Sequence, residues 1–234
     1  VNSETNIIQT FAGGGNLTGD SIAAIQAAIN GTWGITGDNA ANIYYSEYGS
    51  CRIRRIGSNG IVTTYAGLLN DCASSNSGVG RTSARLNGPS AILFDSSAIN
   101  LYFVETKSHR VRYFNLAGLL NDFAGKVGGG FSGDGFSGTN AQLFWPYSIA
   151  LNNGIMLIAD SGNCRIRRIS TQPNSIITTI AGMSFPNIYQ NFTVFLLIPF
   201  IFLNGKDLRR VDQLMPVMEV LRPQRSCISQ VQLL

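Results

Sequence analysis

Charged side chains are scarce in this chain. They make up 13% of its 234 residues, and the formal net charge is only +4. Dedicated nucleic-acid binders carry a strong, clustered basic excess, so the composition does not favour that class of protein. Hydrophobic residues account for 44% of the chain and glycine for 26 positions. This balance excludes a disordered tail as the main component and favours a sheet-rich globular protein.

Residues that bind metals or perform catalysis are also few. His109 is the single histidine, the four cysteines form no Cys-x-x-Cys pair, and no Gly-x-Ser-x-Gly elbow occurs. Structural zinc sites and hydrolase triads depend on such spacings. We therefore expect no catalytic residue, metal site or cofactor in this chain. An enzyme remains an alternative only if further blades outside the chain carry the chemistry.

Helical patterns are missing as well. Residues 1–182 show no apolar stripe with a 3.6-residue period. The apolar run 192–203 is shorter than the roughly 20 residues of a spanning helix, and Pro199 interrupts it. For segment 183–234 we weigh a non-native end from a misjudged exon boundary, a buried strand pair or membrane-dipping anchor, and a single-pass helix.

What the chain does have is a repeat. A short β-branched or aromatic run ends in Ala-Gly four times, at spacings of 54, 58 and 57 residues. The copies are residues 7–13, 61–67, 119–125 and 176–182. A fixed period of this size is typical of repeat architectures, which usually present a binding surface.

Three further motifs keep the same register. Upstream of the Ala-Gly pairs lie arginine-rich strands, apolar runs that end in an acid, and turn segments that lead into a strand. The arginine-rich strands are 52–56, 110–114 and 165–169; the acid-ended runs are 43–47, 101–105 and 156–160; the turn segments are 28–35, 85–92 and 142–149. Each period therefore holds four short strand candidates, separated by turn residues. Four strands per unit is the pattern of a β-propeller blade.

These motifs resemble NHL repeats. The resemblance rests on residues 160–169 and their two weaker copies, and on the glycine loop 123–135 that leads to 141–146. It covers about residues 7–182 and implies a propeller used mainly as an interaction platform. Some members of the family bind protein, some bind RNA, and some related propellers are enzymes. A histidine-rich zinc centre, as lyases with propeller folds use, is not available in this chain.

We predict an all-β fold: a partial β-propeller of NHL type with three four-stranded blades and a non-repeat C-terminal tail. The repeats are placed at about 14–67, 68–125 and 126–182, and the divergent tail at 183–234. Propellers typically have about 4–8 blades, so three do not close a ring. The chain must pair with another copy, belong to a longer protein, or remain open. It opens without Met, inside what resembles the outer strand of a preceding blade, which predicts a fragment.

The recurring arginines are the first candidate site. Arg54, Arg112 and Arg167 would form a circle of positive charge that could hold RNA phosphates or an acidic protein segment. The simpler alternative is structural. Acidic residues recur five positions before Arg52, Arg110 and Arg165, and a turn of that length can bring acid and base together as ion pairs. These acids are Glu47, Glu105 and Asp160.

Aromatic residues at the entry to the innermost strand are the second candidate site. Trp33, Trp145 and Tyr147 could contact a ligand at the channel mouth, although core packing is the default. His109 stands where Cys51 and Cys164 stand in the other repeats, so we expect it to fill a loop-to-strand position. The glycine loops, residues 13–19 and 128–135, are expected to be long connections at the blade tops.

The cysteines and the sequons do not determine the cellular compartment of the protein. Cys51 and Cys164 occupy equivalent positions of different blades, so we do not expect them to pair. Asn-x-Ser/Thr sequons at Asn16, Asn30 and Asn191 permit a secreted or cell-surface location without requiring it.

The function predicted from these features is a non-catalytic interaction module, or scaffold, that binds a protein partner through one rim of the propeller. RNA or other anion binding through the arginine strands is one alternative, and a fragment of a propeller lyase or lactonase is another. Membrane contact through residues 192–203 and self-association of an open ring are further expected partnerships.

Overall fold

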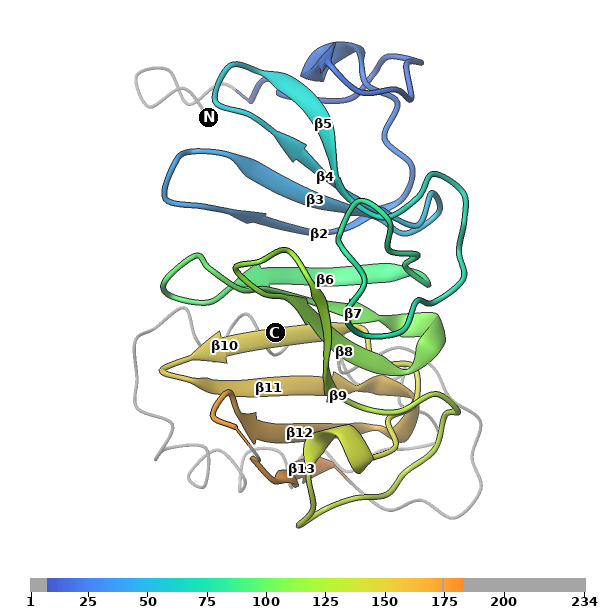
Figure 1. Ribbon diagram of the computed structural model, residues 1–234, viewed down its shortest axis with the longest axis vertical. Coiled ribbons are helices and arrows are strands. Elements are labelled where there is room, and N and C mark those ends of the chain that lie inside the picture. The colour runs from blue at the N-terminus through green and yellow to red at the C-terminus, as the bar shows by residue number, and fades with distance from the viewer. Residues whose placement is uncertain (1–7, 174, 183–234) are drawn as a thin grey trace. The chain divides into compact units, whose positions relative to one another are not determined.

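The structure is a computed structural model, and it describes residues 8–173 and 175–182. Within them the fold is all-β, with short 3-10 turns as the helical elements (Figure 1). These turns are η1 (Ala24–Gln26), η2 (Thr106–Ser108), η3 (Gly138–Asn140) and η4 (Ser161–Asn163). The tail 183–234, with its apolar run and Asn191, lies outside the described residues.

The strands form three antiparallel sheets. The first has the order β1-β5-β4-β3-β2, with β1 (Ile22–Ala23), β2 (Thr32–Gly37), β3 (Ile43–Glu47), β4 (Arg52–Ile56) and β5 (Ile61–Ala66). The second is β6-β7-β8-β9, with β6 (Pro89–Phe94), β7 (Leu101–Glu105), β8 (Arg110–Phe114) and β9 (Leu120–Ala124). The third is β10-β11-β12-β13, with β10 (Ser148–Asn152), β11 (Ile155–Asp160), β12 (Arg165–Ser170) and β13 (Ile177–Gly182).

Each sheet is a meander of four consecutive strands, which is the topology of a propeller blade. The predicted all-β, partial β-propeller fold is therefore confirmed. The first sheet gains a fifth strand, β1, on the outside of β5. The sequence prediction was wrong about the first copy of the Ala-Gly motif, because the described part of that copy, residues 8–13, forms no strand.

Two compact units divide the chain. One comprises Val1–Leu101 and Phe114–Asn121, and the other Tyr102–Tyr113 and Asp122–Leu234. The division follows neither the repeats nor the sheets, because it passes through the strands of the second sheet.

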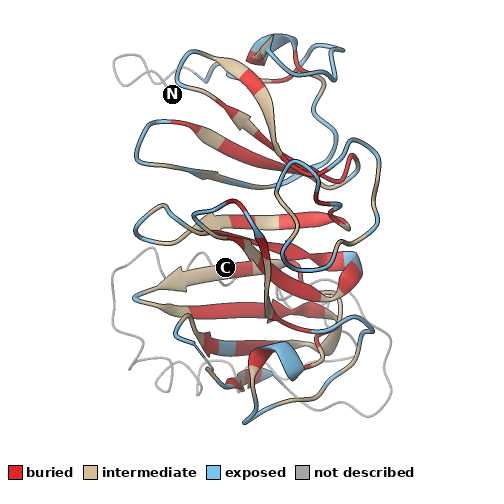
Figure 2. Ribbon diagram, in the orientation of Figure 1, coloured by how far each residue is buried: buried red, intermediate tan, exposed pale blue. Residues whose placement is uncertain are grey.

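Burial follows the apolar runs of the sequence. Every residue of β7 is buried, and so are the last five residues of β11, whereas β2 is largely exposed (Figure 2). Strands that are covered on both faces read as continuous apolar runs, and half-covered strands alternate. In the first unit a core cluster joins Tyr45, Ile56 and Val62 to η1 through Ala24 and Ala27.

The recurring Ala-Gly pair has a steric cause. The alanines Ala66, Ala124 and Ala181 are buried, and the glycines Gly67, Gly125 and Gly182 have φ values of +94°, +85° and +116°. A Cβ on any of these glycines would collide with the carbonyl oxygen of Cys51, His109 or Cys164, respectively. Those three residues are themselves left-handed, with φ of 57°, 59° and 51°. The repeat therefore preserves one tight crossing of backbones, where only glycine fits.

Candidate functional site

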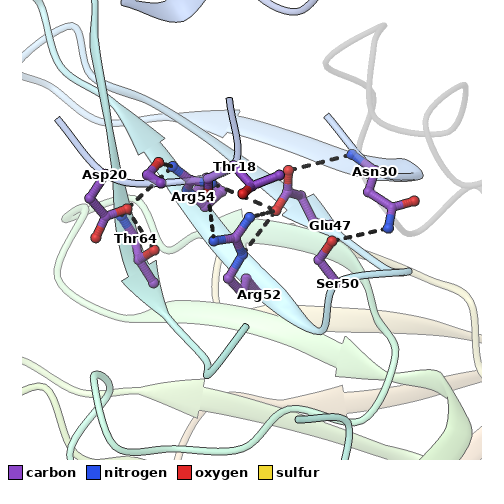
Figure 3. A network of polar contacts seen from close by, with 9 residues as sticks. Thr18, Asp20, Asn30, Glu47, Ser50, Arg52, Arg54 and Thr64 are labelled. Carbon is purple, nitrogen blue, oxygen red and sulfur yellow. Dashed lines mark hydrogen bonds and ion pairs between the residues drawn. The ribbon is translucent and has the colours of Figure 1, made fainter. Parts of the chain in front are cut away.

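The arginine-rich strands carry buried ion-pair networks. In the first unit Glu47 lies directly opposite Arg52 across β3 and β4, and the Arg52 Nη2 atom is 2.6 Å from Glu47 Oε2. Arg54 is fully buried and donates from Nη2 to the carbonyl oxygen of Gly19 at 2.6 Å and to Asp20 Oδ1 at 3.2 Å. Figure 3 shows both guanidinium groups enclosed by backbone and carboxylate oxygens.

The second unit repeats this network in β12. Arg167 is fully buried, and its Nη2 atom lies 2.8 Å from Asp134 Oδ1 while its Nη1 atom lies 3.1 Å from Asp160 Oδ2. Asp20 directly follows the first glycine loop, residues 13–19, and Asp134 lies in the second, residues 128–135. These loops are therefore more than connections, because a residue in or next to each supplies the second carboxylate for a buried arginine.

In the middle repeat the buried arginine is paired with a carboxylate from a different place in the sequence. Its loop has lost the Gly-Asp pair, and Asp122 on β9 takes over. The Asp122 Oδ1 atom is 2.8 Å from Arg112 Nε and 3.2 Å from Arg110 Nη1, while Glu105 lies 3.2 Å from Arg110. Three residues before the Ala-Gly glycine, the other repeats have Thr64 or Thr179. The sequence signal was this change from threonine to aspartate in the repeat that lacks the loop aspartate.

The structural interpretation of the acid–arginine spacing is confirmed for Glu47 with Arg52 and for Glu105 with Arg110. Burial lowers the pKa of Arg54 and Arg112, and the neighbouring carboxylates oppose that shift. Arg54, Arg112 and Arg167 expose none of their side-chain surface. Anion or RNA binding through them stays a prediction, and it would require these networks to open.

The predicted aromatic site is divided between the two units. Trp33 lies on β2 in the first unit, is 42% exposed and packs at 5.5 Å on Tyr48. In the second unit Trp145 stacks on the buried Tyr147 at 6.4 Å. A role for these side chains at a channel mouth stays a prediction.

His109 serves the local structure of the second unit. It caps η2 in the left-handed conformation, as expected for a loop-to-strand position, and its Nδ1 accepts a hydrogen bond of 3.1 Å from the Trp145 N–H. Its ring stacks on Phe144 at 5.3 Å. Desolvation lowers the pKa of His109, so the neutral form with its proton on Nε2 is favoured.

A pocket that the sequence analysis did not identify lies within the first unit. It has a volume of about 440 Å³ and opens beside the turns that join β2 to β3, β6 to β7 and β8 to β9. Its lining includes Tyr44, Tyr65 and Phe94; Tyr44 meets Tyr65 edge-on at 5.0 Å and Phe94 at 4.9 Å. The exposed side chains of Ile99 and Leu116 stand at its margin, 43% and 79% accessible.

Positive charge exceeds negative charge in this pocket. Arg55 and Arg81 line it together with one carboxylate, Asp38. Arg81 lies 4.8 Å over the ring of Tyr65, and Arg55 donates to the side-chain oxygen of Asn42 at 2.7 Å. Within the described part of the chain, neither guanidinium group forms an ion pair within 4.0 Å. The partners recorded for these two cations, a tyrosine and an amide oxygen, are uncharged.

Asp38 is occupied by local hydrogen bonds. Its burial opposes ionisation, but donors from Asn42, Tyr44 and the Ala40 N–H outweigh that effect and lower its pKa. Burial, and then the hydrogen bond to Asp38, raise the pKa of Tyr44 to about 12. The signal in the sequence was the doublet Arg54-Arg55, because adjacent strand residues face opposite sides of the sheet. Arg54 enters the buried network, and Arg55 faces the pocket.

Two negative findings apply to the described residues alone. They contain no cluster of three or more His, Cys, Asp or Glu side chains that could hold a metal ion. None of their helices has the length and apolar character needed to cross a membrane.

Comparison with known proteins found distant similarity among solved structures. No family model matches the chain, and no curated protein matches it. Virginiamycin B lyase from Staphylococcus aureus is 17% identical with a TM-score of 0.44, over 68% of this chain and 42% of the lyase. An auxiliary nutrient binding protein from Bacteroides ovatus is 18% identical with a TM-score of 0.48, over 67% and 37%.

A nidogen/laminin complex contains a chain that is 14% identical with a TM-score of 0.48, over 71% of this chain and 52% of that one. This chain thus spans between about a third and about half of the length of these proteins. Similarity at this level assigns no activity or partner to the chain.

Proposed function

We propose that this chain is a non-catalytic interaction module of the NHL-repeat type, and that it binds an acidic segment of a partner protein at the pocket of the first unit. The observation that carries the proposal is the pair Arg55 and Arg81, which line one pocket without an ion pair in the described residues. An arriving carboxylate would supply the missing counter-charge. Charge-assisted hydrogen bonds to guanidinium groups are among the stronger polar contacts.

The surroundings of the two arginines support a peptide rather than an isolated ion. Tyr65 and Phe94 offer aromatic surface beside the cations, and Ile99 and Leu116 add exposed apolar side chains at the margin. Aromatic and arginine side chains are enriched at the energetically important centres of protein interfaces. We therefore expect the segment to combine acidic with apolar residues.

The test uses random peptides displayed on phage and selected on the full chain. Enriched peptides should contain more Asp and Glu than the starting library, and their binding should weaken as NaCl is raised. Arg81→Gln should weaken binding about tenfold, the effect of losing about 1.4 kcal/mol. Arg85→Gln is the matched control, because Arg85 is exposed and pairs with Asp71 at 2.8 Å.

Peptides without acidic enrichment, or peptides bound equally by the Arg81→Gln chain, would contradict the proposal. Loss of binding in the Arg85→Gln control as well would point to general electrostatic attraction instead of this pocket.

A further inference from the structure

We propose that Asn16 is an N-glycosylation site of this chain, and that the neighbouring sequon at Asn30 is not used in the folded protein. Both asparagines belong to the first unit and both are exposed as residues. Their sequence motifs, Asn16-Leu17-Thr18 and Asn30-Gly31-Thr32, are equally acceptable. The surroundings of the two amide groups distinguish them.

The Asn16 sequon is held in an extended, outward-facing form. Leu17 pairs with Ala27 in a parallel bridge, its N–H donating to Gln26 at 3.2 Å and its carbonyl oxygen accepting from the Ala28 N–H at 2.7 Å. Residues on either side of an extended residue point to the same face. Asn16 and Thr18 are both exposed, so the acceptor amide and the hydroxyl of its sequon are presented together.

Buried arginines fix the backbone beneath this sequon. The carbonyl oxygen of Thr18 accepts hydrogen bonds from Arg52 Nη1 at 3.1 Å and from Arg54 Nη1 at 3.3 Å (Figure 3). These bonds use the main chain of Thr18 and leave its hydroxyl unused by them. The Asn16 side chain has no hydrogen bond within the described residues. A glycan on Asn16 would therefore break no contact of the fold.

The Asn30 side-chain amide, in contrast, takes part in a hydrogen bond of the fold. Its Nδ2 donates to Ser50 Oγ at 3.1 Å, and its backbone N–H donates to Glu47 Oε1 at 3.4 Å. Gly31 has a φ of +67°, which turns the chain between Asn30 and Thr32. A Cβ on Gly49 would lie 2.7 Å from Asn30 Oδ1, so the amide packs closely against that backbone. A sugar on Nδ2 would have to displace Ser50 and this packing.

Disulfide bonding is the independent observation that links the chain to the compartment where glycans are added. Cys51 and Cys72 form a disulfide with a Cα–Cα distance of 5.2 Å. Disulfides form and persist in the secretory pathway and are rare in reducing compartments. The transferred group would come from a lipid-diphosphate-linked oligosaccharide in that compartment.

The transfer step balances without a further reactant. The Asn16 Nδ2 atom bonds to C1 of the donor sugar as the bond from C1 to the diphosphate oxygen breaks. The lipid diphosphate leaves with that electron pair, and the amide loses one proton to a base of the transferase. No oxidation or reduction occurs.

The experiment translates the full 234-residue chain, behind a cleavable leader, in an extract that contains endoplasmic-reticulum microsomes. Asn191→Gln removes the third sequon from the background. Peptide N-glycosidase F in ¹⁸O-water then marks each formerly glycosylated asparagine for mass spectrometry, and the Cys51–Cys72 crosslinked peptide identifies folded chains. Thr18→Ala should abolish the mark at Asn16 while keeping the main-chain contacts to the arginines, and Thr18→Ser should retain it.

The expected result is a mark at Asn16 in most disulfide-bonded chains and none at Asn30. An unmarked Asn16 in those chains, or an equal mark at Asn30, would overturn the inference. Absence of the Cys51–Cys72 crosslink in the microsomes would overturn it as well, because the link to the secretory compartment would be lost.

Discussion

The fully buried guanidinium groups of Arg54, Arg112 and Arg167 each lie within 4.0 Å of two carboxylates. Replacing both partners of a buried ion pair with apolar groups is often tolerated, whereas removing one partner leaves an unpaired buried charge. The exchange of a loop aspartate for Asp122 in the middle repeat satisfies this constraint. The number of paired charges is thus preserved although their positions in the sequence change.

The first prediction at the residue scale concerns Arg112. Arg112→Met should lower the free energy of unfolding by about 3–5 kcal/mol, because Glu105 and Asp122 would lose a buried counter-charge. Arg168→Met is the control on an exposed strand position, and it should change stability by less than about 0.5 kcal/mol. Urea unfolding of both variants measures the difference; equal effects would show that the network is not what stabilises the sheet.

The second prediction separates close approach from backbone conformation. Gly125→Ala should destabilise the fold by more than Gly128→Ala, although the two glycines have similar φ values of +85° and +95°. A left-handed non-glycine residue costs about 1–2 kcal/mol, and this applies to both. Only Gly125 also faces the His109 carbonyl oxygen, while Gly128 has open space around it. Thermal unfolding of the two variants gives the comparison, and equal melting temperatures would refute the steric explanation of the Ala-Gly repeat.

The third prediction is a pH dependence caused by Tyr44. The raised pKa of about 12 means that the folded state favours the protonated phenol more than the unfolded state does, where the pKa is near 10.0. This contribution to stability is complete below pH 10 and is lost as the pH rises through 12. The stability difference between the native chain and Tyr44→Phe should therefore shrink over this window in urea titrations. A constant difference would contradict the assigned pKa.

At the scale of the structural element, the Cys51–Cys72 disulfide ties the segment that follows β5 to the start of β4. The two cysteines are 21 residues apart in the sequence. Crosslinks that close loops of this size stabilise by about 3 kcal/mol, chiefly by restricting the unfolded chain.

Cys72→Ser should therefore reduce the free energy of unfolding by about 3 kcal/mol. Urea unfolding of the variant and of the native chain, both without reductant, measures the difference. A Cys72→Ser chain as stable as the native one would contradict the prediction. It would mean that the crosslink does not restrict the unfolded chain enough to stabilise the fold.

At the scale of the whole molecule, the second sheet contributes strands to both compact units. The boundaries between the units fall inside β7, β8 and β9, so unfolding of one unit should disrupt strands that also belong to the other. We therefore expect one cooperative transition for the described part of the chain.

The two tryptophans allow a direct test, because Trp33 belongs to the first unit and Trp145 to the second. Trp145→Phe leaves Trp33 as the reporter, and Trp33→Phe leaves Trp145. The fluorescence of the two variants should change at the same urea concentration. Each midpoint is first corrected for the change in overall stability that its substitution causes, which circular dichroism measures. Two separated midpoints would mean that the units unfold independently.

The sequence alone determined the strands of the three blades. Motifs that keep one register in each repeat define the β-branched runs and the turns between them, and these depend on local geometry. The spacing of Glu47 and Arg52, or of Glu105 and Arg110, also predicted cross-strand ion pairs, because a short turn brings such residues opposite each other.

Tertiary structure decided the remaining features. Asp20 and Asp134 reach arginines more than 30 residues away in the chain, and Cys72 finds Cys51 across a long connection. No local pattern specifies these partners, since loop paths depend on packing. The pocket between Arg55 and Arg81 and the contrast between Asn16 and Asn30 arise in the same way. In each case the residue type is visible in the sequence, but its chemistry depends on which neighbours the fold places beside it.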